Sequence, residues 1–358
     1  MQSSKKELRS SDHLRSLIAQ HTPLLDVRAA LEFDQGSLPC SHNVGILNDD
    51  ERAAVGAAYK NEGAAAATAL GHDLVRGTTK TNRLNQWVEF IKSRPGAMVM
   101  CWRGGQRSQI AQAWLKQSGL HIERVPGGYK ALRNLCLELL DETAATEKPW
   151  WIVAGRTGVQ KTVLIQQLDT SLDLEALANH RGSAFGAQAT AQPMLATFEN
   201  QLAYQAYNHS KAILVLEDES RTIGKLGMPL RWHERMKRSP LALIEASLES
   251  RVEHIVDEYV TRALATGIKP AALEKQYREA LSKISRRLGG LLFDKIDQLI
   301  AQAFAHTSSH NAWVSSLLND YYDPMYDYQL RKKESRIAFR GNLSDVEQFL
   351  TAQAVLAE

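Results

Sequence analysis

Short apolar runs alternate with helical patterns over the first 140 residues of the chain. Runs typical of buried strands occupy residues 23–28, 98–101 and 122–125. Behind the second run, apolar residues recur at the spacing of a helix, and so do those at 129–140. This alternation predicts an α/β domain over residues 1–140.

The same alternation starts again after a short polar segment. Residues 141–148 are polar and carry no periodic signal, which is typical of a linker. An apolar run at 150–154, a glycine loop and a helical pattern at 161–168 follow, with a further strand pattern at 212–216. A second α/β domain is therefore expected over residues 149–240.

The pattern becomes helical after Pro240. Apolar residues from Ile244 onward recur at helical spacing as far as about Leu318, and no convincing strand interrupts them. We therefore expect a helical segment over residues 241–318, appended to or inserted in the second domain. The remainder, 319–358, returns to strand and helix patterns and is expected to pack on the second domain.

Composition narrows the class of protein. Apolar residues form 44% of the 358, which is enough for real cores. Three cysteines are too few for a disulfide framework, so a reducing cytoplasm is expected. The N-terminus does not resemble a secretory signal, and no apolar run reaches the roughly 18 residues of a membrane span. The net charge of +3 permits a local basic surface without indicating a nucleic-acid partner.

Cys101 is the strongest candidate for chemistry. It ends an apolar run and opens a glycine-bearing loop that leads into a helix. Backbone N–H groups in such a loop can converge on one point, and the helix dipole and two arginines add positive potential. This setting favours a thiolate with an anion held over the sulfur, whereas the alternative is a buried cysteine in a basic turn. The residues expected to hold the anion are Arg103, Gly104, Gly105, Arg107 and Ser108.

A second anion site is predicted at the start of the second domain. Residues 155–162 stand between a predicted strand and a predicted helix, as a Walker A loop does. Gln160 occupies the position of the second signature glycine, where the backbone must approach a phosphate. The loop therefore either cradles a diphosphate, with Lys161 as its charge, or has a structural role only. Its candidate ligands are Gly155, Thr157, Gly158, Lys161 and Thr162.

Two carboxylates follow the strand pattern at 212–216. Glu217 and Asp218 stand where a Walker B pair would hold Mg²⁺, and solvated carboxylates are the alternative interpretation. The eleven histidines show no metal-ligand spacing. We therefore expect no tightly bound cofactor and no resident metal site, with Mg²⁺ as an ion that the carboxylate pair could take up.

The first domain resembles the rhodanese family. Asp26 and Arg28, the Cys101 loop and the turn at 126–129 lie in that family's order. The resemblance implies a rhodanese-like fold in which Asp26 and Arg28 brace the sheet edge rather than react. The spacing from Cys101 to Arg107 is one residue longer than in typical sulfurtransferases of this fold, and related phosphatases share it. A wider anion cradle is therefore expected.

The chain as a whole resembles the tRNA 2-selenouridine synthase family. The segments that carry the resemblance are residues 50–60, 101–105, 179–186 and 219–224, in the family's order. Their combination is far more specific than any one motif, and the helical tail agrees in length. The resemblance therefore extends beyond the cysteine loop to the second domain.

The resemblance implies a reaction on the wobble uridine of tRNA. Enzymes of this family replace the sulfur of 2-thiouridine with selenium from selenophosphate. They also attach a geranyl group from geranyl diphosphate to that sulfur, which turns a poor leaving group into a departing thiol. On this interpretation Cys101 is the nucleophile. The diphosphate is then held by the second loop together with Arg181, Ser183 and Arg221.

A tRNA substrate needs cationic and aromatic contacts. Basic residues cluster at 231–238, 286–287 and 331–333, and Trp102 and Trp232 could stack on a base. Each cluster taken alone is more often a solvated helix face, so the tRNA interface follows from the resemblance. The candidate contacts are Trp102, Arg231, Trp232, Arg235, Lys237 and Arg238.

Two other functions stay open at this point. A phosphatase or a thiosulfate sulfurtransferase would use the cysteine loop, although neither reaction requires the long second domain. A non-catalytic tRNA-binding protein would account for Gln160 in the phosphate loop. Cys40 and Cys136 are expected to have no redox role, and His180 is expected to be structural.

Overall fold

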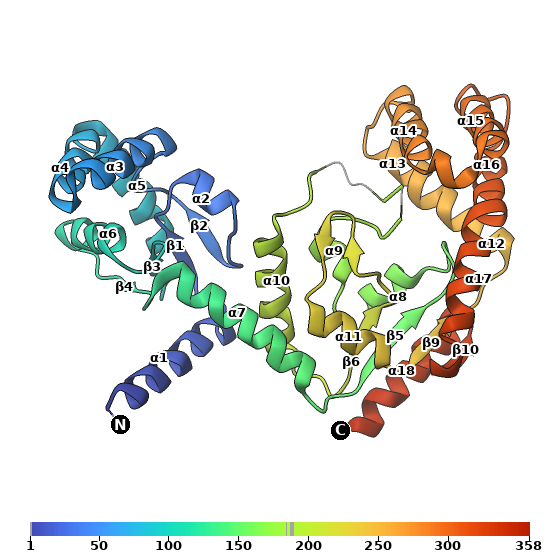
Figure 1. Cartoon of the computed structure of the whole chain (residues 1–358), viewed down its shortest axis with the longest axis horizontal. Coiled ribbons are helices and arrows are strands. Elements are labelled where there is room, and N and C mark those ends of the chain that lie inside the picture. The colour runs from blue at the N-terminus through green and yellow to red at the C-terminus, as the bar shows by residue number, and fades with distance from the viewer. Residues whose placement is uncertain (1, 184, 187–189) are drawn as a thin grey trace. The chain divides into compact units, whose positions relative to one another are not determined.

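The computed structural model describes residues 2–183, 185–186 and 190–358, with side chains from residue 11 onward. Ala184, which belongs to one of the segments that carry the family resemblance, lies outside the described residues. The chain forms two compact units (Figure 1). The first consists of residues 1–145 and 193–209, and the second of residues 146–192 and 210–358.

The first unit is built on a four-stranded parallel sheet in the order β2-β1-β3-β4. Its strands are β1 (Leu24–Asp26), β2 (Ser41–Asn43), β3 (Met98–Met100) and β4 (Glu123–Arg124). The two central strands are buried along their whole length, as expected where helices cover both faces of a parallel sheet. Its helices are α1 (Gln2–Ala19), α2 (Ala30–Asp34), α3 (Asp49–Glu62), α4 (Ala64–Leu74), α5 (Gly77–Ser93), α6 (Gln106–Gln117), α7 (Gly128–Ala145) and α10 (Leu195–Asn208).

Helix α7 corrects the predicted domain boundary. It continues to Ala145, because buried Leu139, Leu140 and Ala144 extend its apolar side beyond residue 140. The linker predicted at 141–148 is therefore helical as far as residue 145. Only a short stretch separates α7 from the first strand of the second unit.

Helix α10 corrects the predicted extent of the second domain. It lies within the range 149–240 but packs in the first unit against α7 and α1. Arg133 of α7 forms an ion pair with Glu199 and donates a hydrogen bond of 3.0 Å to Asn200 Oδ1. Phe198 and Leu202 are fully buried, so α10 completes the core of the first unit.

The second unit is built on another four-stranded parallel sheet, in the order β10-β9-β5-β6. Its strands are β5 (Trp150–Ala154), β6 (Leu214–Glu217), β9 (Leu241–Ile244) and β10 (Ile337–Gly341), and β7 (Thr222–Ile223) pairs with β8 (Leu226–Gly227) as a hairpin. Strand β9 contradicts the prediction that residues after Pro240 are helical. Its four residues are all buried, and a short apolar run of this kind fits a strand or a buried helix equally well by periodicity.

Helices flank this sheet and form a separate helical lobe. Around the sheet lie α8 (Lys161–Gln167), α9 (Leu174–Ala178), α11 (Leu230–Arg238) and α18 (Leu343–Ala357). The lobe contains α12 (Leu248–Val256), α13 (Arg262–Ala265), α14 (Pro270–Leu288), α15 (Gly290–Phe304), α16 (His310–Leu317) and α17 (Asp323–Lys332), with π-helical turns at Asp257–Thr261 and Leu318–Tyr322. None of the helices in the described ranges is long and apolar enough to cross a membrane.

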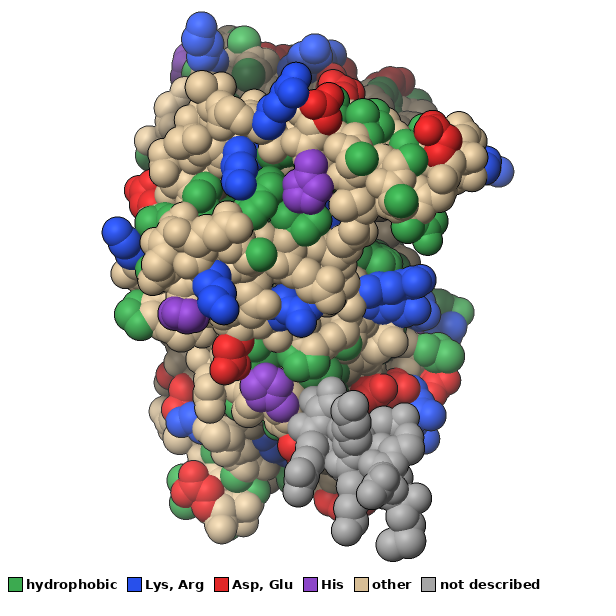
Figure 2. All heavy atoms as spheres, turned by 90° about the vertical axis from the view of Figure 1, so that its left-hand side faces the viewer, with side chains coloured by type: hydrophobic (Ala, Val, Ile, Leu, Met, Phe, Trp, Pro, Cys, Tyr) green, Lys and Arg blue, Asp and Glu red, His purple; other side chains and the backbone are tan. Residues whose placement is uncertain are grey.

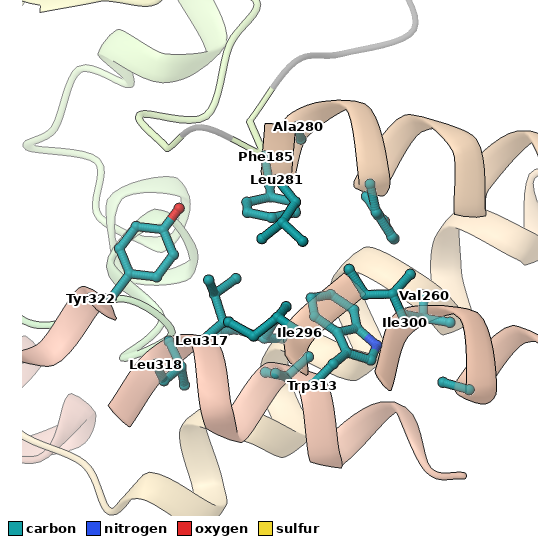
Figure 3. Close-up of a cluster of buried hydrophobic side chains, with 14 of the residues drawn as sticks. Phe185, Val260, Ala280, Leu281, Ile296, Ile300, Trp313, Leu317, Leu318 and Tyr322 are labelled. Atoms are coloured by element: carbon teal, nitrogen blue, oxygen red, sulfur yellow. The ribbon is translucent and has the colours of Figure 1, made fainter. Parts of the chain in front are cut away.

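The helical lobe has its own hydrophobic core, shown in Figure 3. Leu281, Ile296, Ile300 and Trp313 pack together there with Phe185. Phe185 comes from the segment that follows α9, on the sheet side of the unit. The side chain therefore ties the region beside the phosphate loop to the lobe.

Candidate functional site

Cys101 lies in the loop between β3 and α6, where the sequence places it. The turn at 126–129 shapes this loop, because Tyr129 N donates to the carbonyl of Cys101 and Lys130 N donates to that of Trp102, each at 2.9 Å. Gly128 makes the close approach possible. Its φ is +61°, and a Cβ at this position would lie 2.2 Å from the carbonyl oxygen of Cys101.

The thiol of Cys101 faces a cavity of about 500 Å³. Cys101 is only 3% exposed, so a substrate reaches its sulfur through that cavity. The thiol donates to Ser108 Oγ at 3.4 Å, and the Ser108 hydroxyl donates to the carbonyl of Gly105 at 2.9 Å. Ser108 therefore contacts the sulfur directly and holds the loop in shape.

Arg107 has a partner that the sequence did not indicate. Its guanidinium donates to both carboxylate oxygens of Glu32, at 2.5 and 3.1 Å. Burial opposes ionisation of Glu32, but the bonds from Arg107 outweigh it and lower the pKa of Glu32. Arg107 lines the cavity, as expected, but part of its guanidinium is held by Glu32, so its role as a direct anion ligand stays a prediction.

Two other arginines line the cavity beside the sulfur. Arg103, a predicted ligand, is exposed there. Arg52 of α3 lines the same cavity, with its side chain 55% exposed and its Nε 3.6 Å from Glu32. The sequence prediction missed Arg52 as a ligand, although residue 52 falls in the segment 50–60. Gly105 lines the cavity as well, whereas Gly104 accepts a 3.0 Å bond from Arg124.

Asp26 and Arg28 form a buried ion pair of 2.7 Å beneath the loop. Arg28 also donates to the carbonyls of Glu32 and Gly36, at 3.1 and 2.9 Å. Its guanidinium carbon lies 3.9 Å from the ring centre of Tyr129 and 5.9 Å from that of Trp102, which is 39% exposed. The pair has the bracing arrangement that the rhodanese resemblance implied, and it supports an exposed indole next to the sulfur.

The loop predicted to bind phosphate, called the phosphate loop below, runs from β5 to α8. Lys161 Nζ donates to the carbonyls of Gly155 and Arg156, at 3.0 and 3.3 Å, inside the loop. Gln160 has a φ of 69°, in the left-handed region that glycine adopts more readily. The loop is therefore formed with glutamine at this position, at some cost in backbone strain.

A cavity of about 540 Å³ opens at this loop. Most of the predicted diphosphate ligands line it, and these are Thr157, Gly158, Lys161, Thr162, Arg181 and Ser183. Gly155 shapes the loop without lining the cavity, and Arg221 is exposed before β7 rather than in the cavity. The structure therefore brings together six of the eight predicted residues.

The helical lobe supplies one side of this cavity, which the sequence did not reveal. Arg181 pairs with Glu258 at 3.0 Å, and its guanidinium carbon lies 4.7 Å from the ring centre of Tyr259. Tyr326 of α17 lies with its ring centre 5.7 Å from Lys161 Nζ. These contacts come from residues about 80 to 165 positions away in sequence, which no local pattern connects.

The two carboxylates proposed as a Walker B pair do not fit that role. Both oxygens of Asp218 accept bonds from Lys333 Nζ, at 2.7 and 2.6 Å. Glu217 is 1% exposed, and burial raises its pKa well above the ordinary value. Among the residues whose placement is described, no cluster of His, Cys, Asp and Glu could hold a metal ion. The pair is thus neither a magnesium site in this arrangement nor a set of solvated carboxylates.

Further carboxyl groups surround the start of α8. Thr162 donates to Glu175 at 3.0 Å, and Glu175 also accepts the backbone N–H of Gly182 at 2.5 Å. Burial, with the neighbouring Glu175, raises the pKa of Glu219 to about 8. The polar end of this cavity therefore contains Glu219, a carboxyl group whose pKa lies at about 8.

The predicted tRNA contacts divide into exposed and structural residues. Trp232 is fully buried against Trp150, with ring centres 4.9 Å apart, so the prediction that it stacks on a base is wrong. Arg235 donates to the carbonyls of Thr146 and Lys148 and has an anchoring role. Arg231, Lys237 and Arg238 are exposed on α11. On the face of the first unit shown in Figure 2, Lys and Arg side chains are spread out rather than gathered in one patch.

Comparison with known proteins finds relatives that match the chain over both units. The model of a family described as the tRNA 2-selenouridine synthase AAA domain matches residues 148–356. The chain is 42% identical to the tRNA 2-selenouridine synthase of Sulfurovum sp. (strain NBC37-1), over 96% of this chain and 99% of that one. It is also 42% identical to that of Psychromonas ingrahamii, over 97% and 98%. The corresponding protein of Pseudomonas entomophila is 40% identical, over 95% of each chain.

Proposed function

The chain belongs to the tRNA 2-selenouridine synthase family, and we propose that it converts wobble 2-thiouridine of tRNA to 2-selenouridine in two steps. The sulfur is first geranylated with geranyl diphosphate and is then replaced by selenium from selenophosphate. The observation that carries this proposal is the presence of two loops suited to anions, each lining a cavity of its own. We assign the first unit as a rhodanese-like domain, since its cysteine loop follows the central strand of a parallel sheet.

The geranylation step uses the cavity at residues 155–162. The thiouridine sulfur forms a bond to C1 of the geranyl group, the C1–O bond breaks, and diphosphate departs with the bonding electrons. The proton on N3 of the base is released to solvent. Lys161 stabilises the charge that grows on the departing diphosphate, and Thr157 and Gly158 offer backbone groups nearby.

The selenation step uses Cys101. Its thiolate adds to C2 of the base, the C2–S bond breaks, and the sulfur leaves as geranylthiol after taking up a proton. Selenium of selenophosphate then adds to C2 and expels the Cys101 thiolate. Water cleaves the P–Se bond, which gives phosphate and 2-selenouridine. Arg103 and Arg52 provide the charge for selenophosphate, and Trp102 provides a surface on which the base stacks.

Nucleoside analysis tests this function directly. The protein is incubated with tRNA that carries 2-thiouridine, and the digested RNA is examined by mass spectrometry. Geranyl diphosphate alone should give S-geranyl-2-thiouridine, and addition of selenophosphate should convert it to 2-selenouridine. Absence of both products in all reactions rejects the proposal.

The pairing of Arg107 with Glu32 argues against a phosphatase. A Cys-x5-Arg phosphatase binds its phosphate through this arginine, whereas here two of the N–H groups of Arg107 are held by Glu32 and fewer remain for a phosphate. Turnover of a generic phosphoester or of thiosulfate in the absence of tRNA is therefore expected to be negligible. Tight tRNA binding without either modified nucleoside would instead support a non-catalytic binding protein.

A further inference from the structure

The cavity beside Cys101 has an apolar interior that the selenium donor does not need. The buried residues that line it are Ile46, Leu47, Ala67, Val75 and Trp114, and partly buried Val55 and Ile110 join them. Selenophosphate is a small, highly charged anion, so apolar walls offer it no favourable contact. The interior therefore suits a second, hydrocarbon part of a ligand.

The local sequence explains why this space exists. Helices α3 and α4 pack on each other with few large side chains, since the buried residue of α3 is Ala58 and that of α4 is Ala67. Alanine leaves room that leucine or phenylalanine would fill. The alanine-rich helices thus leave room for an apolar interior within a cavity of about 500 Å³ in all, which is in the range of small-molecule sites.

Charged and aromatic groups gather where the cavity meets solvent. Tyr59 is 64% exposed and Trp102 is 39% exposed, and the lining arginines Arg52 and Arg103 are also exposed. Glu32, which also lines the cavity, pairs with Arg107 and lies 3.6 Å from Arg52 Nε. An apolar interior with a cationic and aromatic opening matches a hydrocarbon chain attached to a nucleotide.

We propose that this cavity binds the ten-carbon chain of the geranylated wobble nucleotide and so places its C2–S bond at Cys101. The assignment rests on the proposed function, because that function supplies a sulfur that carries a geranyl group. The chain enters among the buried residues, and the base stays at the opening beside Trp102. The cavity also retains the chain when geranylthiol is released from C2.

Two RNAs that differ only in the S-alkyl group test the proposal. One is an anticodon stem-loop with S-geranyl-2-thiouridine at the wobble position, and the other carries S-methyl-2-thiouridine there. Fluorescence anisotropy with the full-length protein measures both affinities. We expect the S-geranyl RNA to bind at least about tenfold more tightly, because each buried methylene contributes to binding. Equal affinities overturn the proposal.

Variants that fill the cavity test whether the preference for the S-geranyl RNA arises there. Val55→Phe on α3 and Ala67→Leu on α4 should each reduce it to about twofold or less, while the affinity for the S-methyl RNA stays the same. Ala57→Phe is the matched control, because Ala57 is exposed on α3 and does not line the cavity. Thermal unfolding shows which variants are folded. If the folded cavity variants keep the wild-type preference for the S-geranyl RNA, the proposal is overturned. If neither variant folds, the affinities of the wild-type protein for the two RNAs decide the question.

Turnover separates this proposal from the proposed function. A wild-type protein that makes 2-selenouridine but binds both RNAs equally refutes the cavity assignment and leaves the function intact. A protein that prefers the S-geranyl RNA in a Val55-dependent way, but forms no modified nucleoside, supports the cavity assignment and refutes the function.

Discussion

The thiol of Cys101 contacts the hydroxyl of Ser108, and no other cysteine is among the described residues that line its cavity. We predict that Cys101→Ala lowers selenium incorporation at least about a thousandfold, because the nucleophile is lost. Geranylation should stay within about twofold of the wild-type rate, since it uses the other cavity. Mass spectrometry of nucleosides measures both products.

Cys40 provides the matched control for this substitution. It is an exposed free thiol in the first unit, outside the cavity lining, so Cys40→Ala should leave both reactions unchanged. Burial raises the pKa of the third thiol, Cys136, to about 12, which makes that group unreactive near neutral pH. Full selenium incorporation by Cys101→Ala would remove Cys101 from the mechanism.

Lys161 is expected to act on the diphosphate and on no other substrate. Lys161→Ala should raise the KM for geranyl diphosphate about 10- to 100-fold, because a charge-assisted hydrogen bond contributes about 1.5–3 kcal/mol. The affinity for tRNA should not change. Initial rates of geranylation and a separate tRNA titration measure the two quantities. Lys225→Ala, at an exposed lysine in the β7–β8 hairpin, is the control, and unchanged kinetics for Lys161→Ala contradict the assignment.

For single residues, the local sequence predicts where a residue lies in the fold better than it predicts which residues it contacts. Cys101 directly follows the buried strand β3, and Lys161 begins the helix after the loop that follows β5, so a local pattern predicts the place of each. The pairing of Arg107 with Glu32 joins residues 75 positions apart, so nothing near either residue indicates it. Trp232 stands among charged residues of α11 and was therefore expected on the surface. The structure buries it because that side of α11 packs on Trp150.

At the scale of elements, the turn at 126–129 supports the cysteine loop through backbone contacts. Gly128→Ala should lower the free energy of unfolding by about 1–2 kcal/mol for the left-handed conformation alone, and the contact with the Cys101 carbonyl adds to this. The midpoint of thermal unfolding measures the change. Gly105→Ala is the control, since its φ is −91° and a Cβ there meets nothing within 4 Å. Equal midpoints for the two variants would contradict the prediction.

Helix α17 is attached to the phosphate loop by a buried ion pair. Arg251 donates to both oxygens of Asp323, at 2.8 and 2.7 Å, and also to the carbonyl of Thr157 at 3.3 Å. Asp323→Ala leaves the buried guanidinium without its counterion, so we predict a loss of about 3–5 kcal/mol in the free energy of unfolding. Thermal or urea unfolding of the second unit measures this loss.

A double variant distinguishes lost charge compensation from lost packing. Arg251→Met combined with Asp323→Ala should be less destabilised than Asp323→Ala alone, because no unpaired charge remains buried. Glu279→Ala, which removes an exposed partner of Lys275, should change stability by less than about 0.5 kcal/mol. A double variant less stable than Asp323→Ala would argue that the arginine stabilises by packing.

Most elements of both sheets could be predicted from the apolar runs, and β9 shows where that signal fails. Leu241–Ile244 is followed at once by the helical pattern of α12, so its apolar residues continue that pattern without a visible break. What identifies β9 as a strand is pairing with β5 and β10, which lie about 90 positions away on either side. Pairing at that distance leaves no mark on local periodicity.

For the molecule as a whole, the chain order does not match the order of the units. Residues 146–192 belong to the second unit, 193–209 return to the first, and the rest belongs to the second. The apolar side of α10 predicts a helix with one buried face, but it does not say which core buries it. The sequence therefore predicted two α/β units but assigned α10 to the wrong one. This helix belongs to the first unit, although the residues before and after it belong to the second.

The stability of the whole chain should fall as the pH rises from 7 to 8.5. Burial holds the pKa of Glu219 at about 8, whereas an unfolded chain releases this proton near pH 4.5. Between the pKa of the unfolded state and that of the folded state, the folded chain binds more protons than the unfolded chain. Raising the pH through this window therefore favours unfolding. Partial burial lowers the pKa values of His180, His233 and His310, and a lowered histidine pKa makes stability rise with pH, so these groups do not produce the expected fall. A group with a pKa of about 8 then accounts for a loss of about 1 kcal/mol over this range. Glu219→Gln should make the dependence shallower, with the remainder due to Glu217, whose raised pKa acts in the same direction, while Glu253→Gln, at an exposed position, should not change it. Unfolding midpoints measured at both pH values test this, and identical slopes for wild type and Glu219→Gln would show that Glu219 is ionised in the folded protein at neutral pH.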